Sequence, residues 1–477
     1  MKRLSPRITT LLFILCYGLI GHTKSLSEQE VLKSIERLYP PYLAELIKHE
    51  LGNAKVQGAI GSFDTRLSLK AQLRPKNYYD ASNYEAMLER PFMNSGGFLY
   101  GGYRLSQGYL PSYYRKYRTS DYGEAVIGLN IPLLRDRKID QRRASLSKAE
   151  IDRELATPSI ALQYLGILEA ARKAYYDWVI RGYVLRGAED LLNIAQARQK
   201  AFTTEVQEGA RAEIILVDNK RILVERQLLV NQAQLDFDNA AQVLSLFYRS
   251  QKSGAPIVAS EKQHPKELMY PEVYSASQKK KDLLRIRTTH PELKTVELLK
   301  RKANIDLELA QNNKKPDLSF VLEMNRNIYG DVPKDIEETE LEALIKFTIP
   351  IGQNEAKGAE RAAKAQLEQL ALRKTFVKDK LASNLEVTYA ALKNAFKAIT
   401  LNQENETLAQ QLLDAENNKF NLGASTLLNL QLREQTLLSA KLSTLNSIGT
   451  YYSTYAAYLK AAAIDLKGKG VTSAIAL

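Results

Sequence analysis

The sequence predicts a mainly α-helical protein in which two long helical hairpins are carried on β-strands. Two distant stretches follow one plan, because a short strand-like run ending in Ile-Pro occurs at residues 125–132 (AVIGLNIP) and again at 343–350 (ALIKFTIP), 218 residues later. A glycine turn follows each run, at Gly209 and at Gly423, which lie 214 residues apart. Self-similarity at a fixed separation is typical of a repeated structural unit. This plan suits a conduit better than an enzyme.

The N-terminal residues 1–25 have the pattern of a secretory signal peptide. Three basic residues precede the short apolar run LLFILCYGLI at 11–20, and small or polar residues follow it. This run is too short for a membrane-spanning helix. Lipidation of Cys16 stays open, although Leu15 before it disfavours that reading. Cys16 is the only cysteine, so removal of the leader leaves a mature chain without disulfides.

The distribution of charge argues against nucleic-acid binding. The formal charge of +13 falls to +9 when the four basic residues of the leader are removed. The remaining cations alternate with glutamates along predicted helices, which is typical of solvated helix faces, and the run 279–281 (KKK) is expected in a solvated loop. No later apolar stretch approaches the roughly 20 residues of a spanning helix. The mature chain is therefore soluble, or it crosses a membrane as a β-barrel.

Alternating apolar and polar residues predict four strands, at 63–73, 122–131, 317–327 and 341–349, although the alternation is weak in the second. Residues 74–121 lack a helical period and hold nine tyrosines and two Gly-Gly pairs. Tyrosine enrichment is common at membrane interfaces. This segment is expected either to fold over an outer mouth, to extend a barrel hairpin, or to form an aromatic surface loop.

Long helices account for most of the remaining chain. A helical segment is expected at 28–57 with an interruption at Pro40-Pro41, and a long helix from 133 to about 204 with a kink or break at Pro158. After each turn glycine the apolar residues recur every seven positions, which predicts packing against a partner helix. These stripes consist of Leu216, Leu223, Val230, Phe237 and Leu244, and of Leu438, Leu445, Tyr452 and Leu459.

The predicted organisation has two structural repeats behind the leader. The first repeat covers residues 26–250, with its helical hairpin at about 133–250. A polar, proline-containing linker covers 251–290. The second repeat covers 291–465, with its hairpin at about 352–463, and a short tail occupies 466–477.

Several segments, in order, resemble the TolC family of outer membrane efflux proteins. The two strand-to-helix junctions at 131–152 and 349–369 resemble those of the family, and 289–320 resembles the stretch that leads into its third strand. Residues 413–440 (LDAENNKFNLGASTLLNLQLREQTLLSA) resemble the tip and return helix of its second hairpin. The similarity extends over nearly all of the mature chain, with 61–69 resembling one subgroup.

The resemblance implies a homotrimer in the outer membrane. Each copy would give four strands to a shared 12-stranded barrel in lipid and its helices to a long periplasmic tunnel. Four strands cannot close a barrel alone, so the need for several copies also follows from the chemistry of the bilayer. The implied function is passive export, driven by an inner-membrane pump. A periplasmic adaptor would dock at the helical tips, which by residue match are Val206, Gly209, Phe420, Leu422 and Gly423.

The predicted pore entrance departs from the family pattern. Well-known members carry a ring of acidic side chains after the second turn glycine, whereas the matching positions here are Asn429 and Leu432, with Ile215 in the first copy. Asp218 is the nearest acidic candidate in the first hairpin. Asp218, Asp414 and Glu416 are nevertheless expected to be solvated helix charges. An acidic ring that selects cations is therefore in doubt.

Other function classes find little support. The four histidines are unclustered, and no HExxH, phosphate-binding loop or nucleophile elbow occurs, so we expect no enzyme, no metal site and no cofactor. The main alternative is an exported trimeric coiled-coil scaffold or adhesin without a channel. Within the family, drug efflux, metal efflux and type I protein secretion stay open.

Overall fold

The computed structural model describes residues 25–75, 80–108, 118–331 and 338–465. The predicted leader (1–25, with Cys16) and the tail 466–477 lie almost wholly outside these ranges. The chain forms two compact units, a smaller one of Met1–Ser34 and Ala174–Tyr270, and a larger one of Ile35–Lys173 and Pro271–Leu477. Each unit is described by itself below.

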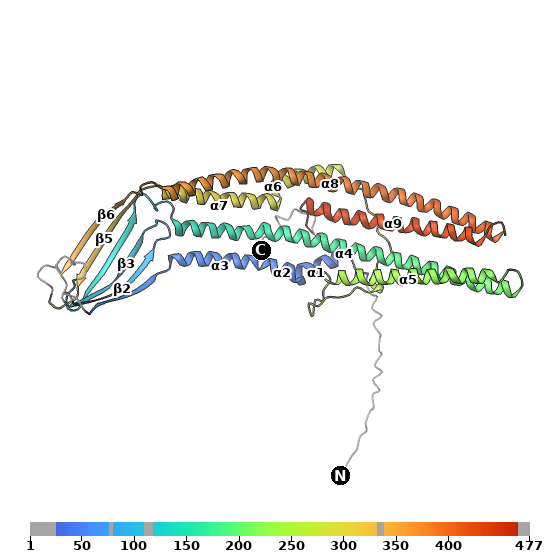
Figure 1. Ribbon diagram of the computed structural model, residues 1–477, viewed down its shortest axis with the longest axis horizontal. Helices are drawn as coiled ribbons and strands as arrows, with labels where there is room; N and C mark the ends of the chain where they lie inside the picture. The colour runs from blue at the N-terminus through green and yellow to red at the C-terminus, as the bar shows by residue number, and fades with distance from the viewer. Residues whose placement is uncertain (1–24, 76–79, 109–117, 332–337, 466–477) are drawn as a thin grey trace, which may run out of the picture. The chain divides into compact units, whose positions relative to one another are not determined.

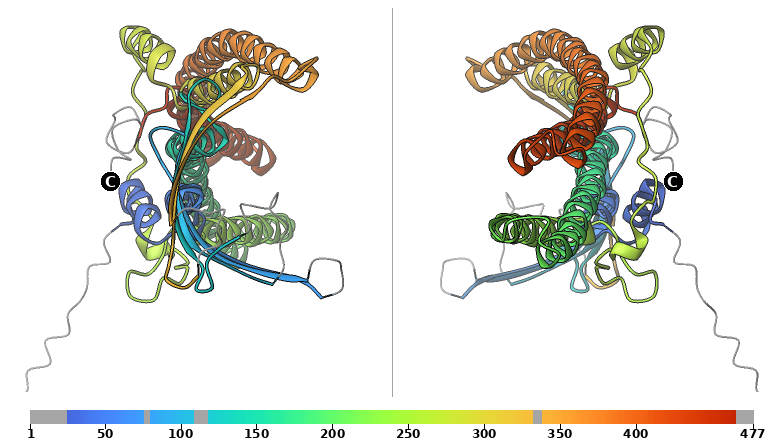
Figure 2. Two further views of the ribbon diagram at one scale, coloured as in Figure 1. Left: turned by 90° about the vertical axis from the view of Figure 1, so that its left-hand side faces the viewer. Right: turned by 90° about the vertical axis from the view of Figure 1, so that its right-hand side faces the viewer.

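The larger unit contains one antiparallel sheet whose strands follow one another in chain order from β1 to β6 (Figure 1). The connection from β4 to β5 spans nearly two hundred residues, and yet these strands pair directly, Glu124 opposite Asn327 and Pro132 opposite Ser319. Figure 2 shows the sheet twisting along its length. Its strands are β1 (Arg66–Arg74), β2 (Ala81–Pro91), β3 (Phe98–Gly108), β4 (Glu124–Pro132), β5 (Asp317–Asn327) and β6 (Thr339–Thr348).

The prediction of four strands was therefore wrong. The four expected strands exist as β1, β4, β5 and β6, and β5 has the predicted bounds. The Tyr/Gly-rich segment adds a hairpin, β2–β3, that separates β1 from β4 in the sheet. The described part of residues 74–121 therefore forms two further strands of the sheet, and it does not lengthen a hairpin between β1 and β4.

Within the larger unit, the helices that precede or follow the strands in the chain form a layer beyond one end of the sheet. A break before Pro40 separates α1 from α2, and α3 begins at Lys48. α3 lies against α4, where Gly52 faces Arg153 so closely that an added Cβ would lie 3.0 Å from the arginine Cα. Ion pairs link α4 to α7 (Lys302–Asp152, 2.6 Å) and α7 to α8 (Lys374–Glu297, 3.0 Å). The lateral order is thus α3, α4, α7, α8. The bounds are α1 (Glu28–Leu38), α2 (Pro40–Leu46), α3 (Lys48–Ile60), α4 (Gln141–Gln207), α7 (Pro291–Asn313) and α8 (Asn354–Asn421).

The long helices correspond to the predicted hairpins. α4 is continuous through Pro158, so the expected break there is absent. The return helix α9 (Leu427–Ala461) packs on α8, and the predicted heptad residues Leu438, Tyr452 and Leu459 are buried. None of the described helices has both the length and the apolar character of a membrane-spanning helix.

The predicted linker contains a helix, α6 (Ala276–Thr289), and Lys279 lies in it rather than in a loop. Asp282 anchors α6 to the end of α9, because its buried carboxylate accepts hydrogen bonds from Tyr458 (2.9 Å) and Arg285 (3.0 Å). Arg285 also donates to the Ala462 carbonyl (2.8 Å). Burial raises the pKa of the Tyr458 hydroxyl, which keeps it a donor to the carboxylate.

The smaller unit holds the second part of α4, helix α5 (Ile214–Ser245) and the segment up to residue 270. Its core is aromatic: Trp178 is fully buried and stacks on Phe237 at 6.0 Å between ring centroids. His264 lies edge-on to Trp178 at 5.2 Å, and its Nε2 donates to the Val179 carbonyl (2.7 Å). These contacts hold the segment after α5 against α4.

Candidate channel wall and hairpin turns

The six strands divide their side chains between an apolar face and a polar face. Successive side chains of a strand point to opposite faces, and the register aligns residues of one kind across the sheet. One row, for example, joins Leu88, Gly101, Ile127, Met324 and Leu341. The row next to it joins Glu89, Tyr100, Gly128, Glu323 and Glu342. The alternation predicted for four strands therefore extends over all six.

The apolar face is exposed in every strand. Leu69 in β1 is 74% exposed and Ile345 in β6 is 68% exposed. An exposed apolar surface of this extent marks contact with lipid or with another protein. The large apolar residues of this face that are exposed are Leu67, Leu69, Leu73, Tyr84, Leu88, Leu99, Tyr103, Ile127, Met324, Leu341, Ile345 and Phe347.

The polar face carries a buried ion network that joins three strands. Arg104 of β3 pairs through Nη1 with Glu124 of β4 (3.3 Å) and with Glu323 of β5 (3.0 Å). The three side chains are between 4% and 11% exposed. Asn325 donates to the second oxygen of Glu124 (3.3 Å). Each carboxylate thus has a charged partner, which a buried carboxylate requires.

The side chain of Tyr100 in β3 reaches across β4 and adds a hydrogen bond to the same network. Its ring lies over Gly128 of β4, and its hydroxyl donates to Glu323 of β5 (2.5 Å). A Cβ on Gly128 would lie 2.2 Å from the ring, so only glycine leaves room for this contact. The glycine in β4 that weakened its sequence pattern is therefore the residue that lets β3 reach β5.

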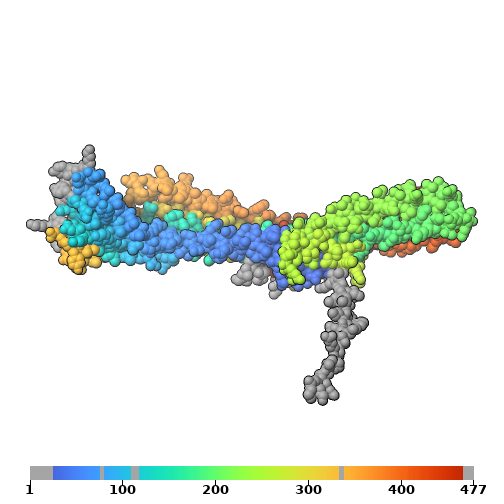
Figure 3. Space-filling view, turned by 90° about the horizontal axis from the view of Figure 1, so that it is seen from below, coloured from blue at the N-terminus to red at the C-terminus, as the bar shows by residue number. Residues whose placement is uncertain are grey.

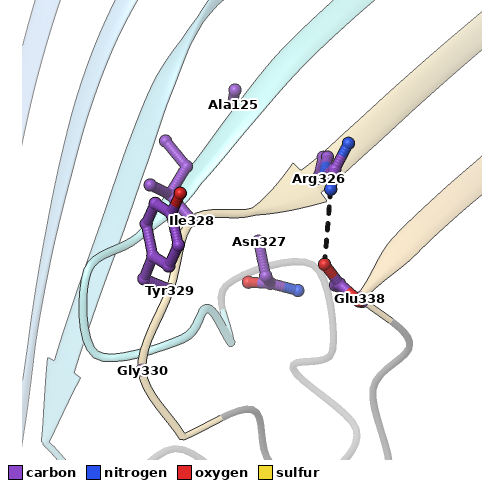
Figure 4. A pocket seen from close by; sticks show the side chains of 7 residues that line it. All are labelled: Ala125, Arg326, Asn327, Ile328, Tyr329, Gly330 and Glu338. Carbon is purple, nitrogen blue, oxygen red and sulfur yellow. Dashed lines mark hydrogen bonds and ion pairs between the residues drawn. The ribbon is translucent and has the colours of Figure 1, made fainter.

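The ends of β4 and β5 that are remote from the helices form a shallow hollow of about 440 Å³ (Figure 4). Arg326 and Glu338 face each other across it at 3.4 Å, and both are largely exposed. Tyr329 is 86% exposed at its edge, and Tyr122 nearby is 65% exposed. Exposed tyrosines at one end of an apolar band are typical of a membrane–water interface.

The two hairpin turns have the same backbone hydrogen bonds. In the first, the Gly209 N–H donates to the Val206 carbonyl (3.0 Å) and the next N–H to Glu205 (2.8 Å). In the second, Gly423 donates to Phe420 (3.0 Å) and the next N–H to Lys419 (2.9 Å). Both glycines have positive φ, 77° and 75°. This is the Schellman arrangement, which ends a helix at a left-handed residue.

The predicted tip residues differ in what they expose. Gly209 and Gly423 are exposed, and Leu422 is 83% exposed with its side chain available to a partner. Val206 is half-buried. Phe420 is 7% exposed, so its side chain is buried beside the turn and is not presented to a partner.

The predicted entrance residues lie at the starts of the return helices. Ile215 is half-buried and Asp218 exposed near the start of α5, whereas Asn429 and Leu432 are exposed in the first turns of α9. The backbone N–H of Asn429 is capped by the Thr426 hydroxyl (3.4 Å).

Glu416 is not the solvated charge that the sequence suggested. Ser425 donates to it across the second turn (2.5 Å), and Arg433 of α9 lies 3.7 Å away. The Ser425 hydrogen bond, followed by the nearby cations, lowers the pKa of Glu416. The signal missed in the sequence is the Thr/Ser-rich stretch 425–426, which provides hydroxyl partners beside the turn. Among the described residues, no group of three histidine, cysteine or acidic side chains is placed to hold a metal ion.

Comparisons with known proteins give structural matches only. No protein-family model matches the chain, and no curated protein sequence does. Solved outer membrane proteins, several of them channels, match it over most of both chains. The chain has the fold of these outer membrane channels. The mostly helical chain with one antiparallel sheet agrees with the coarse fold class expected from the resemblance to the TolC family.

Three of these structures illustrate the match. The CmeC channel of Campylobacter jejuni is 14% identical with a TM-score of 0.60, and the match covers 91% of this chain and 85% of CmeC. The open-state MtrE channel of Neisseria gonorrhoeae is 14% identical with a TM-score of 0.63, covering 91% and 88%. VceC of Vibrio cholerae is 13% identical with a TM-score of 0.61, covering 93% and 96%.

Proposed function

We propose that this protein is an outer membrane channel through which cargo leaves the periplasm. The observation that carries the proposal is the pair of opposed faces in the six-stranded sheet, one apolar and exposed, the other polar and ion-paired. A soluble sheet buries its apolar face, whereas a membrane barrel turns it toward lipid and keeps the polar face toward water. The fold shared with outer membrane channels supports the same reading.

The finer assignments extend this proposal. The sheet cannot close on itself, so the channel is a homotrimer in outer membrane lipid, with the long helices forming a periplasmic tunnel. Export is passive and is powered by an inner-membrane pump. A periplasmic adaptor docks at the hairpin turns, where Leu422 is the most exposed apolar side chain among the predicted tip residues. The entrance is lined by Ile215, Asp218, Asn429 and Leu432.

The proposed domain organisation follows the sequence. Residues 1–25 are removed on export, and residues 26–250 and 291–465 are two structural repeats. Residues 251–290 connect them and include α6, and 466–477 form a tail. The matching hydrogen bonds at the two turns support the repeat.

The test is the single-channel conductance of the detergent-extracted protein in a planar bilayer, with its oligomer mass measured alongside. Trimers that insert and give a small, steady conductance are expected. A protein that stays soluble without detergent and never inserts supports the alternative, an exported trimeric coiled-coil scaffold or adhesin, and overturns the channel.

Two neighbouring aliphatic residues of β6 allow a matched test of which face of the sheet contacts lipid. Ile345 lies on the apolar face and Leu344 on the polar face, and both are exposed. Arginine facing lipid near the bilayer centre costs about 2–4 kcal/mol. Ile345→Arg is therefore expected to reduce outer membrane assembly strongly, whereas Leu344→Arg leaves assembly near the wild-type level. Equal effects of the two substitutions would argue against a lipid-facing surface.

A further inference from the structure

The inserted hairpin β2–β3 is built into the sheet as part of its wall. β2 pairs with β1 over nine residues and β3 pairs with β4 over seven, without a break in register. The buried network joins β3 to β4 and β5 through Arg104 and Tyr100. The hairpin also continues the exposed apolar face through Leu88 and Leu99. A flap over the mouth would have neither a continuous register nor two matched faces.

The turn of this hairpin is fixed where the sheet meets the helices. Arg143, near the start of α4, donates to the carbonyls of Asn94 (3.3 Å) and Asp136 (2.5 Å). The turn lies so close to this junction that a Cβ on Gly96 would be 2.1 Å from the Asp136 carbonyl oxygen. Gly96 has φ of 70°, which glycine adopts without strain. The hairpin is therefore held at its base as well as along its length.

The two edges of the described sheet are complementary. On its polar face β1 carries three cations, Arg66, Lys70 and Arg74, whereas β6 carries Glu340 and Glu342 with one cation, Lys346. With six antiparallel strands, β1 and β6 run in opposite directions, so β1 of one copy meets β6 of the next as an antiparallel pair. Opposite charges facing each other across such a pair are stabilising.

The helices beside these edges also have exposed apolar residues for a neighbouring copy. α3, which leads into β1, lies at the surface in the space-filling view (Figure 3). Leu51 in α3 is 58% exposed. α8, which follows β6, exposes Phe376 (66%) and Leu372 (69%). The edge of the sheet and the edge of the helical layer therefore form one continuous surface on each side of the larger unit.

Six strands match the width of the helical layer better than four. A strand tilted by about 40° occupies roughly 6.3 Å of a barrel's circumference, so six strands span roughly 38 Å and four roughly 25 Å. The four helices α3, α4, α7 and α8, packed about 9 Å apart, span roughly 36 Å. The wall and the helical layer of one copy thus have nearly the same width.

We infer that each copy gives six strands to the barrel, with β1 of one copy paired to the next copy's β6. This rests on the proposed channel function and deepens it. In a trimer the barrel has eighteen strands and a backbone radius of roughly 18 Å, against roughly 12 Å for twelve strands. A side-chain layer about 5 Å deep leaves a lumen radius of roughly 13 Å instead of roughly 7 Å. The lumen of the barrel is then wide enough for cargo up to about 25 Å across.

Disulfide cross-linking tests the pairing, since the mature chain is expected to lack cysteine. Leu69→Cys in β1 is combined in turn with Leu341→Cys, Ala343→Cys, Ile345→Cys or Phe347→Cys in β6, which covers the apolar residues on that face of β6. Five strand spacings, about 24 Å, separate these positions within one chain, so a bond forms only between copies. One of the pairs is expected to give a covalently closed trimer. Failure of all four pairs overturns the inference.

Two further pairs decide whether β2–β3 lies in the wall. Leu99→Cys with Leu129→Cys joins opposite partners of β3 and β4, and it is expected to cross-link within one chain. Leu69→Cys is also combined with Ile127→Cys in β4. The two strands lie about 14 Å apart in a six-stranded sheet, and these residues lie two positions out of register, so the pair is expected to remain reduced. A bond in this second pair shows β1 against β4 with the hairpin displaced. That result overturns the inference even if the protein conducts.

Lumen width is measured by labelling intact cells with maleimide reagents of graded size. Ser68→Cys lies on the polar face of β1, and Leu67→Cys on the apolar face is the matched control. A reagent of about 10 Å radius is expected to label Ser68→Cys at least tenfold faster than Leu67→Cys. Exclusion of this reagent, with labelling by a small one, indicates a twelve-strand lumen. Absence of any conductance would instead refute the proposed function.

Discussion

The glycine at position 182 provides a sharp test of how the smaller unit is held together. Gly182 lies inside α4, directly beneath the buried ring of His264, and a Cβ there would be 2.1 Å from the ring Nε2. His264 is buried, and its ring packs against those of Trp178 and Tyr183 at about 5 Å between centroids. Gly182→Ala must therefore displace the histidine or separate its segment from α4.

The expected loss follows from the hydrogen bonds of that ring. His264 donates to the Val179 carbonyl (2.7 Å) and accepts at Nδ1 from Arg186 (2.6 Å). A neutral hydrogen bond contributes about 1 kcal/mol and one to a charged group about 2 kcal/mol. Alanine is about 1 kcal/mol better than glycine inside a helix, which offsets part of the loss. Gly182→Ala is thus expected to destabilise the smaller unit by about 2 kcal/mol.

Gly187→Ala is the matched control. Gly187 lies five residues further along α4, and its Cβ would have no atom within 4 Å. The same substitution there is expected to stabilise by about 1 kcal/mol through helix propensity alone. Trp178 is the only tryptophan, so urea unfolding followed by its fluorescence reports on this unit. If Gly182→Ala proves as stable as Gly187→Ala, the packing argument is wrong.

Three further predictions concern the larger unit. His290 caps α7 by accepting the Glu292 N–H at Nδ1 (3.2 Å), and burial lowers its pKa to about 4. Between pH 6.5 and 4 the imidazole of His290 is protonated in the unfolded chain and neutral in the folded protein. Acidification across this range should therefore lower the free energy of unfolding, measured by circular dichroism, by about 3 kcal/mol. His290→Asn keeps a helix cap and should lose this part of the pH dependence. Arg104→Met leaves two buried carboxylates without their cation and is expected to cost about 3–5 kcal/mol of stability. The loss should appear on gels as a lower temperature at which the oligomer dissociates. Arg104→Met combined with Glu124→Gln and Glu323→Gln should recover most of the lost stability. Gly423→Ala should cost about 1–2 kcal/mol of local stability in hydrogen exchange, because its φ is 75° and only the backbone conformation opposes a side chain; an unchanged exchange rate would count against a strained turn.

Sequence periodicity was sufficient for the long helices and for four of the strands. Heptads such as Leu438 and Leu459 repeat often enough to predict a packed stripe, and those residues are buried. The turn glycines were predictable for a local reason, since a left-handed helix end favours glycine. In each case the signal lies within a few residues of the element that it specifies.

The missed features depend on partners far away in the chain. Strand β3 reads as an irregular Tyr/Gly stretch until Tyr100 is seen crossing Gly128 to reach Glu323, a residue 223 positions away. Arg104 likewise finds Glu323 only in the folded sheet. Helix α6 was hidden by its polar composition, and Asp282, which anchors it, has its partner Tyr458 176 positions away.

The number of inserted strands is itself constrained by the topology. β1 leaves α3 and runs away from the helices, so the strand that leads into α4 must run back toward them. An antiparallel sheet reverses direction at each strand, and adding two strands between β1 and β4 restores the direction of β4. Adding one strand would deliver the chain to the end of the sheet remote from the helices, where α4 could not pack beside α7 through Lys302 and Asp152. A hairpin is therefore the smallest insertion that widens this wall while the helical layer keeps its order.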